Sequence, residues 1–427
     1  MSLFGPILLL LAMMRTPLFA IIAASAMLGF YAEEIDLSVM AIEIYRLAEM
    51  PVLLAIPLFT FAGYLLGESQ ASTRLVNLTN TLMGWMPGGL AIVAIISCAL
   101  FTAFTGASGV TIVALGALLY PALKEAGYRE NFNLGLLTSS GSLGLLFAPS
   151  LPLILYGVVA QQMSLDIPVS IDQLFLAGIF PGLLMLVMLS LWSMTQPRNR
   201  SLDKANARFN VGAAWQAIKA AGWELPLPFF VLGGIYSGFF AVSEAAAVTA
   251  MYVLIVEVFI LREIPFKKVP QVMRDSMVLV GGIMIILGVS LASTNYLIDT
   301  EVPVRLFEYI QQHVDEKLTF LILLNIFLLL LGMMLDIFSA LVIIVPIILP
   351  IAVGYGIHPV HLGIIFLANM QLGYFTPPVG MNLFIASYRF GKPVMTLYRA
   401  TIPFFLILLV AVLIITYVPM LSMALID

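Results

Sequence analysis

The sequence has few charged residues, and this scarcity excludes an ordinary water-soluble fold. Only 10% of its 427 residues are Asp, Glu, Lys or Arg, whereas 62% are hydrophobic. A single soluble core cannot hide that much apolar surface. The apolar runs at 318–334 and 401–420 approach or reach the roughly 20 residues that a helix needs to cross a bilayer. The composition therefore predicts an integral membrane protein with helical spans, since a β-barrel shows short alternating segments instead.

The sequence is also poor in cysteine, histidine and clustered positive charge. Cys98 is the single cysteine, so an internal disulfide is excluded, and the three histidines form no recognisable metal-ligand set. His358 and His361 have a spacing that suits one helix face, but Pro359 between them favours a loop or a helix start. The net charge is -4 and no basic stripe is present. Nucleic acid is therefore not expected as a partner.

Lys and Arg gather in two of the segments between the apolar runs. By the positive-inside rule, both segments are predicted to be cytoplasmic. Segments 32–50, 161–172 and 299–317 are acidic or mixed, and alternation places them outside. The basic residues are Arg198, Arg200, Lys204, Arg208 and Lys219 in 196–224, and Arg262, Lys267, Lys268 and Arg274 in 261–275.

Two apolar segments are long enough for two helices each but have turn-like middles. Residues 87–121 contain FTGASGV and residues 319–350 contain GMMLDIFS. The charge pattern requires both flanks of each segment to lie on one side, which favours re-entrant hairpins. The first hairpin is expected to open to the cytoplasm and the second to the outside. Two ordinary spans in each segment remain the alternative.

An internal repeat supports the hairpin interpretation. Four proline or glycine pairs share one offset of 229 positions, and LGLLFAPS in one half lies over LGYFTPPV in the other. Because a cytoplasmic segment precedes the first half and an external one precedes the second, the two halves are expected to be inverted in the membrane. The pairs are Pro121 with Pro350, Gly127 with Gly356, Gly144 with Gly373, and Pro149 with Pro378.

The stretch GYFTPPVG predicts a helix that unwinds at mid-membrane. Pro377 and Pro378 lack N–H donors, and Gly380 allows the backbone to leave helical geometry. Freed carbonyls in hydrocarbon need partners, and a sodium ion is one suitable partner. Thr376 and Asn382 can add hydroxyl and amide oxygens, and the resumed half-helix can face an anionic substrate. A simple proline kink packed against neighbouring helices is the alternative.

The corresponding site in the first half is expected from residues 139–150 together with the tip TGASG at 105–109. Gly106 and Gly109 permit a tight tip, and Ser108 supplies a hydroxyl. Asp336, at the position equivalent to Ala107, is expected to cap the next half-helix. Direct cation coordination or proton transfer by Asp336 stays open.

Two further acidic residues in apolar surroundings are expected to have structural roles. Glu244 is predicted to follow a helix cap at Ser243. Glu257 is placed near the cytoplasmic end of its helix.

Several motifs resemble the large membrane subunit of tripartite ATP-independent periplasmic (TRAP) transporters. They are LLAIPLFTFAGYLL, WMPGGLAIV, GGIYSGFFAVSEAAAV, GMMLDIFSALVIIVPIILPIAVGYGIHPVHLGII and LGYFTPPVGMNLF, and the resemblance covers nearly the whole chain. It implies a sodium-driven elevator transporter of the bacterial inner membrane that imports an organic acid. Its implied partners are a small four-helix membrane subunit and a periplasmic substrate-binding protein. Na⁺ is the implied coupling ion, with no organic cofactor and no transition metal.

The resemblance also implies where the ligands bind. Sodium sites are expected where each hairpin tip faces a helix break, and the substrate site is expected between the tips. The stretches FTGASGVTIVALG at the first tip and LLFAPS at the first break depart from the family pattern. The sodium candidates are Gly106, Ser108, Gly109, Ser142, Phe147, Pro149, Gly332, Asp336, Thr376 and Pro378, and the substrate candidates are Ala107, Ser150, Gly380 and Asn382.

These expectations combine into an all-α polytopic fold with inverted repeats, two re-entrant hairpins and two broken helices. Repeat 1 is residues 87–160 and repeat 2 is residues 318–390, while 1–86, 161–317 and 391–427 form the scaffold. The start of the chain is not expected to be a cleaved signal peptide or a fused small subunit. A stand-alone sodium/anion symporter and a proton-driven carrier remain alternatives. An intramembrane enzyme is not favoured, because no paired aspartates, Ser/His pair or metal-ligand set is evident.

Overall fold

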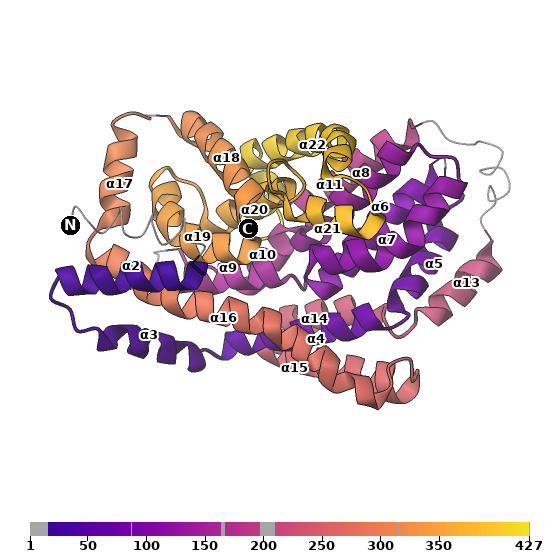
Figure 1. Ribbon diagram of the computed structural model, residues 1–427, viewed down its shortest axis with the longest axis horizontal. Coiled ribbons are helices and arrows are strands. Elements are labelled where there is room, and N and C mark those ends of the chain that lie inside the picture. The colour runs from indigo at the N-terminus through magenta and orange to yellow at the C-terminus, as the bar shows by residue number, and fades with distance from the viewer. Residues whose placement is uncertain (1–15, 87, 164–166, 197–209, 315, 427) are drawn as a thin grey trace.

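The computed structural model describes residues 16–86, 88–163, 167–196, 210–314 and 316–426, and all regular structure in these residues is helical (Figure 1). The expectation that the chain does not start with a cleaved signal peptide or a fused small subunit concerns mainly residues 1–15, which lie outside the described residues. The predicted cytoplasmic charges Arg198, Arg200, Lys204 and Arg208 also lie outside it.

Seven helical segments of the described chain are long and apolar enough to cross a membrane. The pair Glu130–Leu146 and Leu151–Gln162 is bent by 43° at its break and adds an eighth when it is counted as one span. The prediction of a polytopic all-helical membrane protein is therefore confirmed. The seven segments are Pro51–Glu68, Ile171–Met194, Val242–Ile260, Phe266–Asp299, Lys317–Met334, Ile337–Gly354 and Val394–Tyr417.

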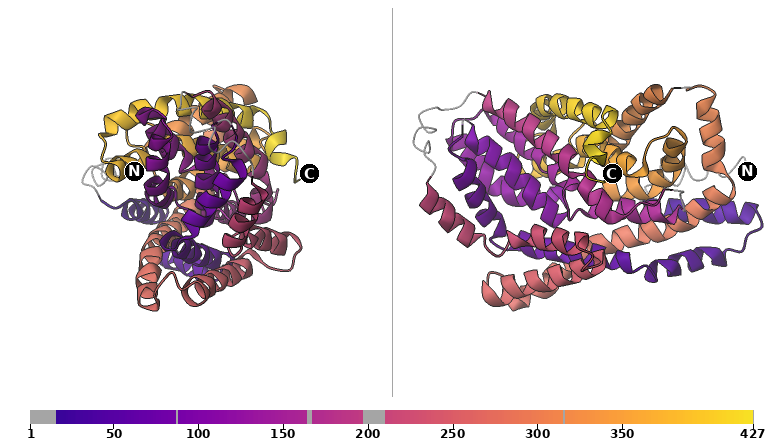
Figure 2. Two further views of the ribbon diagram at one scale, coloured as in Figure 1. Left: turned by 90° about the vertical axis from the view of Figure 1, so that its right-hand side faces the viewer. Right: turned by 180° about the vertical axis from the view of Figure 1, so that it is seen from behind.

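One layer of the molecule is built around the 31-residue helix α16 (Val269–Asp299). This helix runs along the lower part of Figure 1, and Figure 2 shows the same layer from behind. Helices of the N-terminal segment and of the middle of the chain pack in the same layer as α16. Both repeats lie above this layer in the view of Figure 1. The members of this layer are α2 (Leu18–Ala32), α3 (Ser38–Ala48), η1 (Pro51–Leu54), α4 (Ala55–Glu68), α15 (Val242–Leu254) and η3 (Ile255–Ile260, a π-helical turn).

The helices of the two repeats follow the 229-residue offset seen in the sequence. Each helix of repeat 2 begins within one residue of the position predicted from its counterpart in repeat 1. Repeat 1 contains α6 (Gly89–Thr105), α7 (Ser108–Glu125), α8 (Glu130–Ser140), η2 (Leu143–Leu146) and α9 (Leu151–Gln162). Repeat 2 contains α18 (Lys317–Met334), α19 (Ile337–Gly354), α20 (Pro359–Gly373) and α21 (Met381–Phe390).

The remaining helices connect or flank these bodies. The helix α5 joins the long-helix layer to repeat 1 and packs on α6, while α22 packs across α8 and α11. Their bounds are α5 (Ala71–Met83), α10 (Ile171–Ala177), α11 (Ile179–Met194), α13 (Val211–Ala220), α14 (Pro226–Tyr236), η4 (Phe266–Lys268), α17 (Val302–Gln311), α22 (Val394–Tyr417) and α23 (Met420–Met423).

Glycine lets each broken helix approach the first helix of its own hairpin closely. A Cβ atom on Gly144 would lie 2.2 Å from the Ala99 carbonyl oxygen, and one on Gly373 would lie 2.4 Å from Gly332 Cα. Any larger residue must displace backbone at these points. The spacing between each hairpin and its broken helix therefore depends on these glycines.

One predicted helix cap is wrong. The helix α15 begins at Val242, so Ser243 lies within its first turn and does not cap it. Instead the Glu244 carboxylate accepts a hydrogen bond of 2.9 Å from the Ala241 N–H. A carboxylate reaching back from the third helical position satisfies a donor that the helix cannot.

Candidate ion and substrate site

The tip of the first hairpin is a two-residue turn between α6 and α7. Gly106 ends α6 with φ of 66°, a left-handed conformation that glycine adopts without steric cost. Ala107 is extended and precedes the first residue of α7, Ser108. Ser108 is buried, with 5% of its surface exposed. The tip thus places a small, partly polar segment inside the protein.

The tip of the second hairpin carries Asp336 at the equivalent position. The Asp336 carboxylate accepts hydrogen bonds of 3.0 Å from the N–H groups of both Phe338 and Ser339, and one of 2.5 Å from the Ser339 hydroxyl. It is therefore the N-cap of α19. The phenol oxygen of Tyr374 accepts the Ile337 N–H at 2.8 Å. All three N–H groups that open α19 thus have partners.

Both predicted helix breaks are present in repeats 1 and 2. Phe147 to Ser150 separate η2 from α9, and the peptide bond preceding Pro149 is cis. Tyr374 to Gly380 separate α20 from α21, and the peptide bond preceding Pro378 is also cis. At each break a hydroxyl donates to a nearby backbone carbonyl: Ser150 to Leu145 at 2.5 Å and Thr376 to Leu372 at 2.6 Å.

Hydrogen bonds join the two repeats at the predicted site. The Ser108 hydroxyl donates to the Asn382 side-chain oxygen at 2.8 Å, and the Asn382 amide donates to the Thr138 carbonyl at 3.3 Å. Ser142 donates at 3.4 Å to the carbonyl of Gln371, its equivalent in repeat 2. The Asn382 side chain therefore links repeat 2 to repeat 1, a role that the sequence analysis missed.

A cavity of about 210 Å³ lies beside the two hairpin tips. Repeat 1 contributes its tip and Leu145, and repeat 2 contributes the starts of α19 and α21 together with Tyr374. Tyr64 of α4 and Leu279 of α16 complete the wall, so the cavity also touches the long-helix layer. The other lining residues are Gly106, Ala107, Ser108, Gly109, Val110, Ile337, Phe338, Met381 and Ile385.

The structure brings some predicted site residues to this cavity and leaves others around it. Gly106 to Gly109 lie on its wall, whereas Ser142, Ser150 and Asn382 are fully buried and do not line it. Gly332 faces Gly373 in the close helix contact. Phe147 lies against Gly182 of α11, and the Pro378 carbonyl accepts a hydrogen bond from Tyr398. Of the predicted site residues, only Gly106, Ala107, Ser108 and Gly109 belong to the described lining of the cavity.

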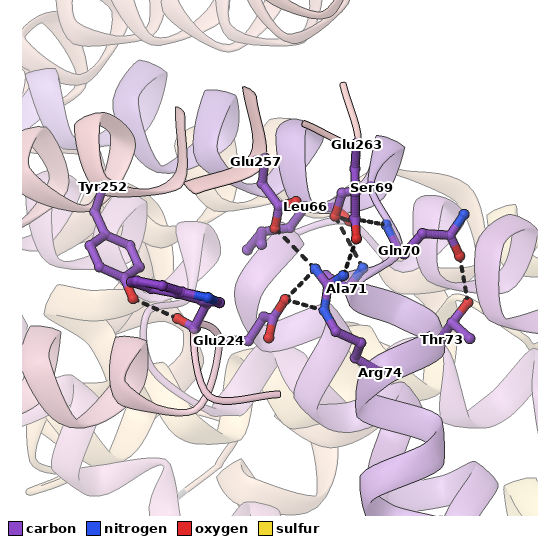
Figure 3. Close-up of polar contacts among 11 residues, drawn as sticks. Leu66, Ser69, Gln70, Ala71, Thr73, Arg74, Glu224, Tyr252, Glu257 and Glu263 are labelled. Atoms are coloured by element: carbon purple, nitrogen blue, oxygen red, sulfur yellow. Dashed lines mark hydrogen bonds and ion pairs between the residues drawn. The ribbon is translucent and has the colours of Figure 1, made fainter. Parts of the chain in front are cut away.

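A second polar cluster, which the sequence analysis missed, ties α4 and α5 to the segments around α14 and α15 (Figure 3). The Arg74 guanidinium contacts the carboxylates of Glu224, Glu257 and Glu263. Its Nε donates to Glu224 at 2.7 Å, and its contact with Glu257 is longer, at 3.4 Å. Glu224 and Glu257 are almost fully buried, and each has one oxygen without a hydrogen-bond partner. Glu257 was the available signal, because a charged residue in an apolar helix usually has a specific partner.

Comparison with known proteins decides the family. Residues 4–421 match the family model described as the tripartite ATP-independent periplasmic transporter, DctM component. The chain belongs to this family. It is a large permease subunit of a TRAP transporter, and such a chain with several apolar helices is a multi-pass protein of the bacterial inner membrane.

TRAP permeases named for different substrates are similar to this chain. The C4-dicarboxylate TRAP transporter large permease protein DctM of Pseudomonas aeruginosa is 34% identical over 386 residues, covering 90% of this chain and 88% of that protein. The 2,3-diketo-L-gulonate TRAP transporter large permease protein YiaN of Escherichia coli is 29% identical and covers 94% of this chain and 92% of that protein. The isethionate TRAP transporter permease protein DctMQ of Oleidesulfovibrio alaskensis is 34% identical, covering 87% of this chain and 57% of that protein.

A solved transporter structure shares the fold. The Alcanivorax borkumensis YdaH transporter superposes with a TM-score of 0.63 at 16% identity, covering 88% of this chain and 86% of that one. At this identity the likeness concerns the fold alone.

Proposed function

We propose that this TRAP permease subunit is a sodium-coupled importer of an organic acid. The acid is delivered by a periplasmic binding protein, and the chain works beside a small four-helix membrane subunit. The observation that carries the proposal is one cavity lined by residues of both hairpin tips, by Leu145 before the first break and by Tyr374 at the second. Broken helices that meet around a central site are how secondary transporters hold ions and substrate within a membrane.

Two sodium sites are part of this proposal, one beside each hairpin tip. The first lies between the tip residues Gly106, Ser108 and Gly109 and the break that includes Ser142, Phe147 and Pro149. The second lies between Gly332 and Asp336 on one side and Thr376 and Pro378 on the other. Hydroxyl and carbonyl oxygens are hard ligands suited to an alkali cation. Ala107, Ser150, Gly380 and Asn382 are the proposed substrate-binding residues.

The transport step is proposed to be an elevator movement of the two repeats. In this scheme α6 to α9 and α18 to α21 move together, because Ser108, Asn382 and Thr138 bond one repeat to the other. The layer of α4 and α16 is the scaffold, and it contributes Tyr64 and Leu279 to the cavity wall. Two pairs, α6 with α7 and α18 with α19, are proposed to be re-entrant hairpins. Sodium binding assembles the tips before the loaded core moves.

Uptake by proteoliposomes tests the proposal. Vesicles that contain this chain and its small membrane partner are supplied with labelled organic acids, with and without a sodium gradient and the binding protein. We expect uptake only when sodium and the loaded binding protein are both present. Uptake with sodium alone would move the chain to the stand-alone symporters, and uptake driven by a proton gradient without sodium would reject sodium coupling.

Two substitutions test the sodium sites in the same vesicles. Asp336→Asn and Thr376→Val should lower sodium-dependent uptake while the protein still inserts and purifies. Asp299→Asn and Thr195→Val are matched controls. They make the same chemical changes as the site variants, but at exposed helix ends. Uptake by the two site variants at the level of the controls would remove Asp336 and Thr376 from the proposed sites.

A further inference from the structure

Three cavities lie along α16, between this helix and the repeats. Leu279 lies on the wall of the cavity beside the hairpin tips. Ser290 and Thr294 lie on the wall of a narrow gap of about 10 Å³, whose other walls belong to α9 and α19. Asn295 lies on the wall of a larger cavity of about 690 Å³. The path from Leu279 to Asn295 covers about 24 Å, because a helix rises 1.5 Å per residue.

The largest of these cavities lies on the predicted external side. Its wall contains residues of α3 and of the start of α10, and both belong to segments that alternation places outside the membrane. Gln162 and Leu291 line this cavity and also the narrow gap. The external cavity therefore continues, as a narrow gap, into the seam between α16 and the repeats.

The cavity beside the hairpin tips lies near the cytoplasmic end of the same layer. Tyr64 lines this cavity and is about one turn of helix before Glu68, the last residue of α4. Glu68 pairs with Lys268, which belongs to the predicted cytoplasmic segment 261–275. The repeats are therefore in an inward position. To receive a substrate from outside, they must carry the cavity along α16 towards its external end.

A movement of this kind brings the second hairpin tip to Ser290 and Thr294. Phe338, at the start of α19, lines the cavity beside the tips. Pro346, about two turns further along α19, lines the narrow gap together with Ser290 and Thr294. An outward shift along α19 by the eight residues from Phe338 to Pro346 is about 12 Å. After this shift Phe338 and the cavity that it lines lie where Pro346 lies now.

The hydroxyls at this place are available for a ligand. Ser290 is 3% exposed, and its hydroxyl has no hydrogen-bond partner among the described residues. Thr294, one turn further along the same helix, is 7% exposed. A buried hydroxyl without a partner is uncommon, because it loses its bonds to water and gains none in return. At the inner end of the path, α16 presents Leu279 instead, which cannot form a hydrogen bond.

We propose that Ser290 and Thr294 line the substrate cavity when the repeats are in their outward position, and that their hydroxyls there donate hydrogen bonds to the organic acid. In the inward position Leu279 takes their place, so α16 holds the acid less strongly. Because a ligand shifts an equilibrium only by its difference in affinity for the two states, the loss of these bonds favours release into the cytoplasm. This inference rests on the proposed function, since it takes the elevator movement and the substrate cavity from it.

Cross-linking tests the outward position of the tip. All variants carry Cys98→Ala, so the introduced cysteines are the only thiols. Phe338→Cys is combined with Ser290→Cys or with Leu279→Cys, and vesicles that contain the variant and the small membrane subunit are treated with a short bismaleimide. We expect both pairs to cross-link. Phe338→Cys with Ile285→Cys is the control and should not cross-link, because Ile285 lies between the other two positions but on an exposed face of α16.

The result separates this inference from the proposed function. A variant that takes up the acid before the reagent is added, but cross-links only through Leu279, would overturn the inference and leave the function standing. An unmodified protein without sodium-dependent uptake would count against the function itself. If the Phe338→Cys variants do not fold or transport, Ala107→Cys on the other tip of the same cavity replaces Phe338→Cys, with the same expected results.

Removal of the two hydroxyls tests their role in uptake. Labelled succinate, 2,3-diketo-L-gulonate and isethionate represent the compounds for which relatives are named. For whichever of them the unmodified protein transports, we expect Ser290→Ala with Thr294→Val to lower uptake about tenfold or more. The unfolding midpoint should not fall, because the Ser290 hydroxyl has no partner to lose.

Two further variants separate the hydroxyls from the packing of α16. Ser290→Thr with Thr294→Ser keeps both hydroxyls and should retain uptake. Ser276→Ala is the matched control, because it removes another buried hydroxyl of α16 that lines none of the three cavities. Uptake by the variant without the two hydroxyls at the level of Ser276→Ala would overturn the proposed contact with the acid.

Discussion

The cluster around Arg74 makes a prediction in which two substitutions act in opposite directions. Three carboxylates surround one guanidinium, and the side chains of Glu224 and Glu257 are only 2% and 1% exposed. Replacing Arg74 with Met leaves these buried carboxylates without a cation. Breaking a buried ion pair in this way costs about 3–5 kcal/mol. We expect Arg74→Met to lower the thermal unfolding midpoint strongly.

Neutralising Glu257 should have a much smaller effect. Its contact with Arg74 is long, at 3.4 Å, and its second oxygen has no hydrogen-bond partner. Glu257→Gln keeps the shape of the side chain and removes one negative charge from a cluster that has an excess of them. We expect a change within about 1 kcal/mol, towards neutral or stabilising, because a poorly paired buried charge contributes little.

Glu224→Gln should fall between these two variants. Glu224 accepts a charge-assisted bond of 2.7 Å from Arg74 Nε, and bonds to charged groups are worth about 1.5–3 kcal/mol. The assay is thermal unfolding of purified protein in detergent, followed by size-exclusion chromatography. Lys268→Met is the control, because its ion pair with Glu68 is 42% and 44% exposed and such pairs contribute about 0–1 kcal/mol. If Glu257→Gln destabilises the protein as much as Arg74→Met, the argument from excess charge is wrong.

Three other predictions concern the repeats. Gly373→Ala should prevent accumulation of folded protein, because its Cβ would lie 2.4 Å from Gly332. A Cβ on Gly281 in α16 would meet nothing within 4 Å, so Gly281→Ala should raise the free energy of unfolding by up to about 1 kcal/mol. Expression levels and unfolding midpoints of both variants check this. Ser108→Ala removes the bond to Asn382 and should cost roughly 0.5–1.5 kcal/mol, which a matched unfolding curve will detect. Replacing sodium with choline should lower the unfolding midpoint of the unmodified protein. An ion present at about a hundred times its dissociation constant stabilises the folded state by about 2.7 kcal/mol. Equal midpoints in the two salts would argue against a sodium site.

The 229-residue offset found in the sequence also relates the helices of the two repeats. The offset rested on proline and glycine, which restrict the backbone locally, and α7 and α19 both begin and end 229 residues apart. The capping role of Asp336 was also predicted from its position before an apolar helix. Its bonds to Phe338 and Ser339 are the geometry of that cap. Local chemistry of this kind is readable because both partners are neighbours in the chain.

Contacts between distant residues could not be predicted. Arg74 meets Glu224 and Glu263 at separations of 150 and 189 residues, and no spacing rule connects them. Asn382 was interpreted as a free ligand because its partner Ser108 belongs to the other repeat. The cap of α15 was misplaced because the nearest hydroxyl was chosen, whereas Glu244 reaches back from a later position.

The bond between Ser108 and Asn382 also has a consequence for biosynthesis. The two residues are 274 positions apart, and chains are synthesised at about 5–20 residues per second. Asn382 therefore leaves the ribosome roughly 14–55 seconds after Ser108, which is long compared with the microseconds in which helices form. During this interval the Ser108 hydroxyl cannot bond to Asn382, so repeat 1 must persist without the contact that later joins it to repeat 2.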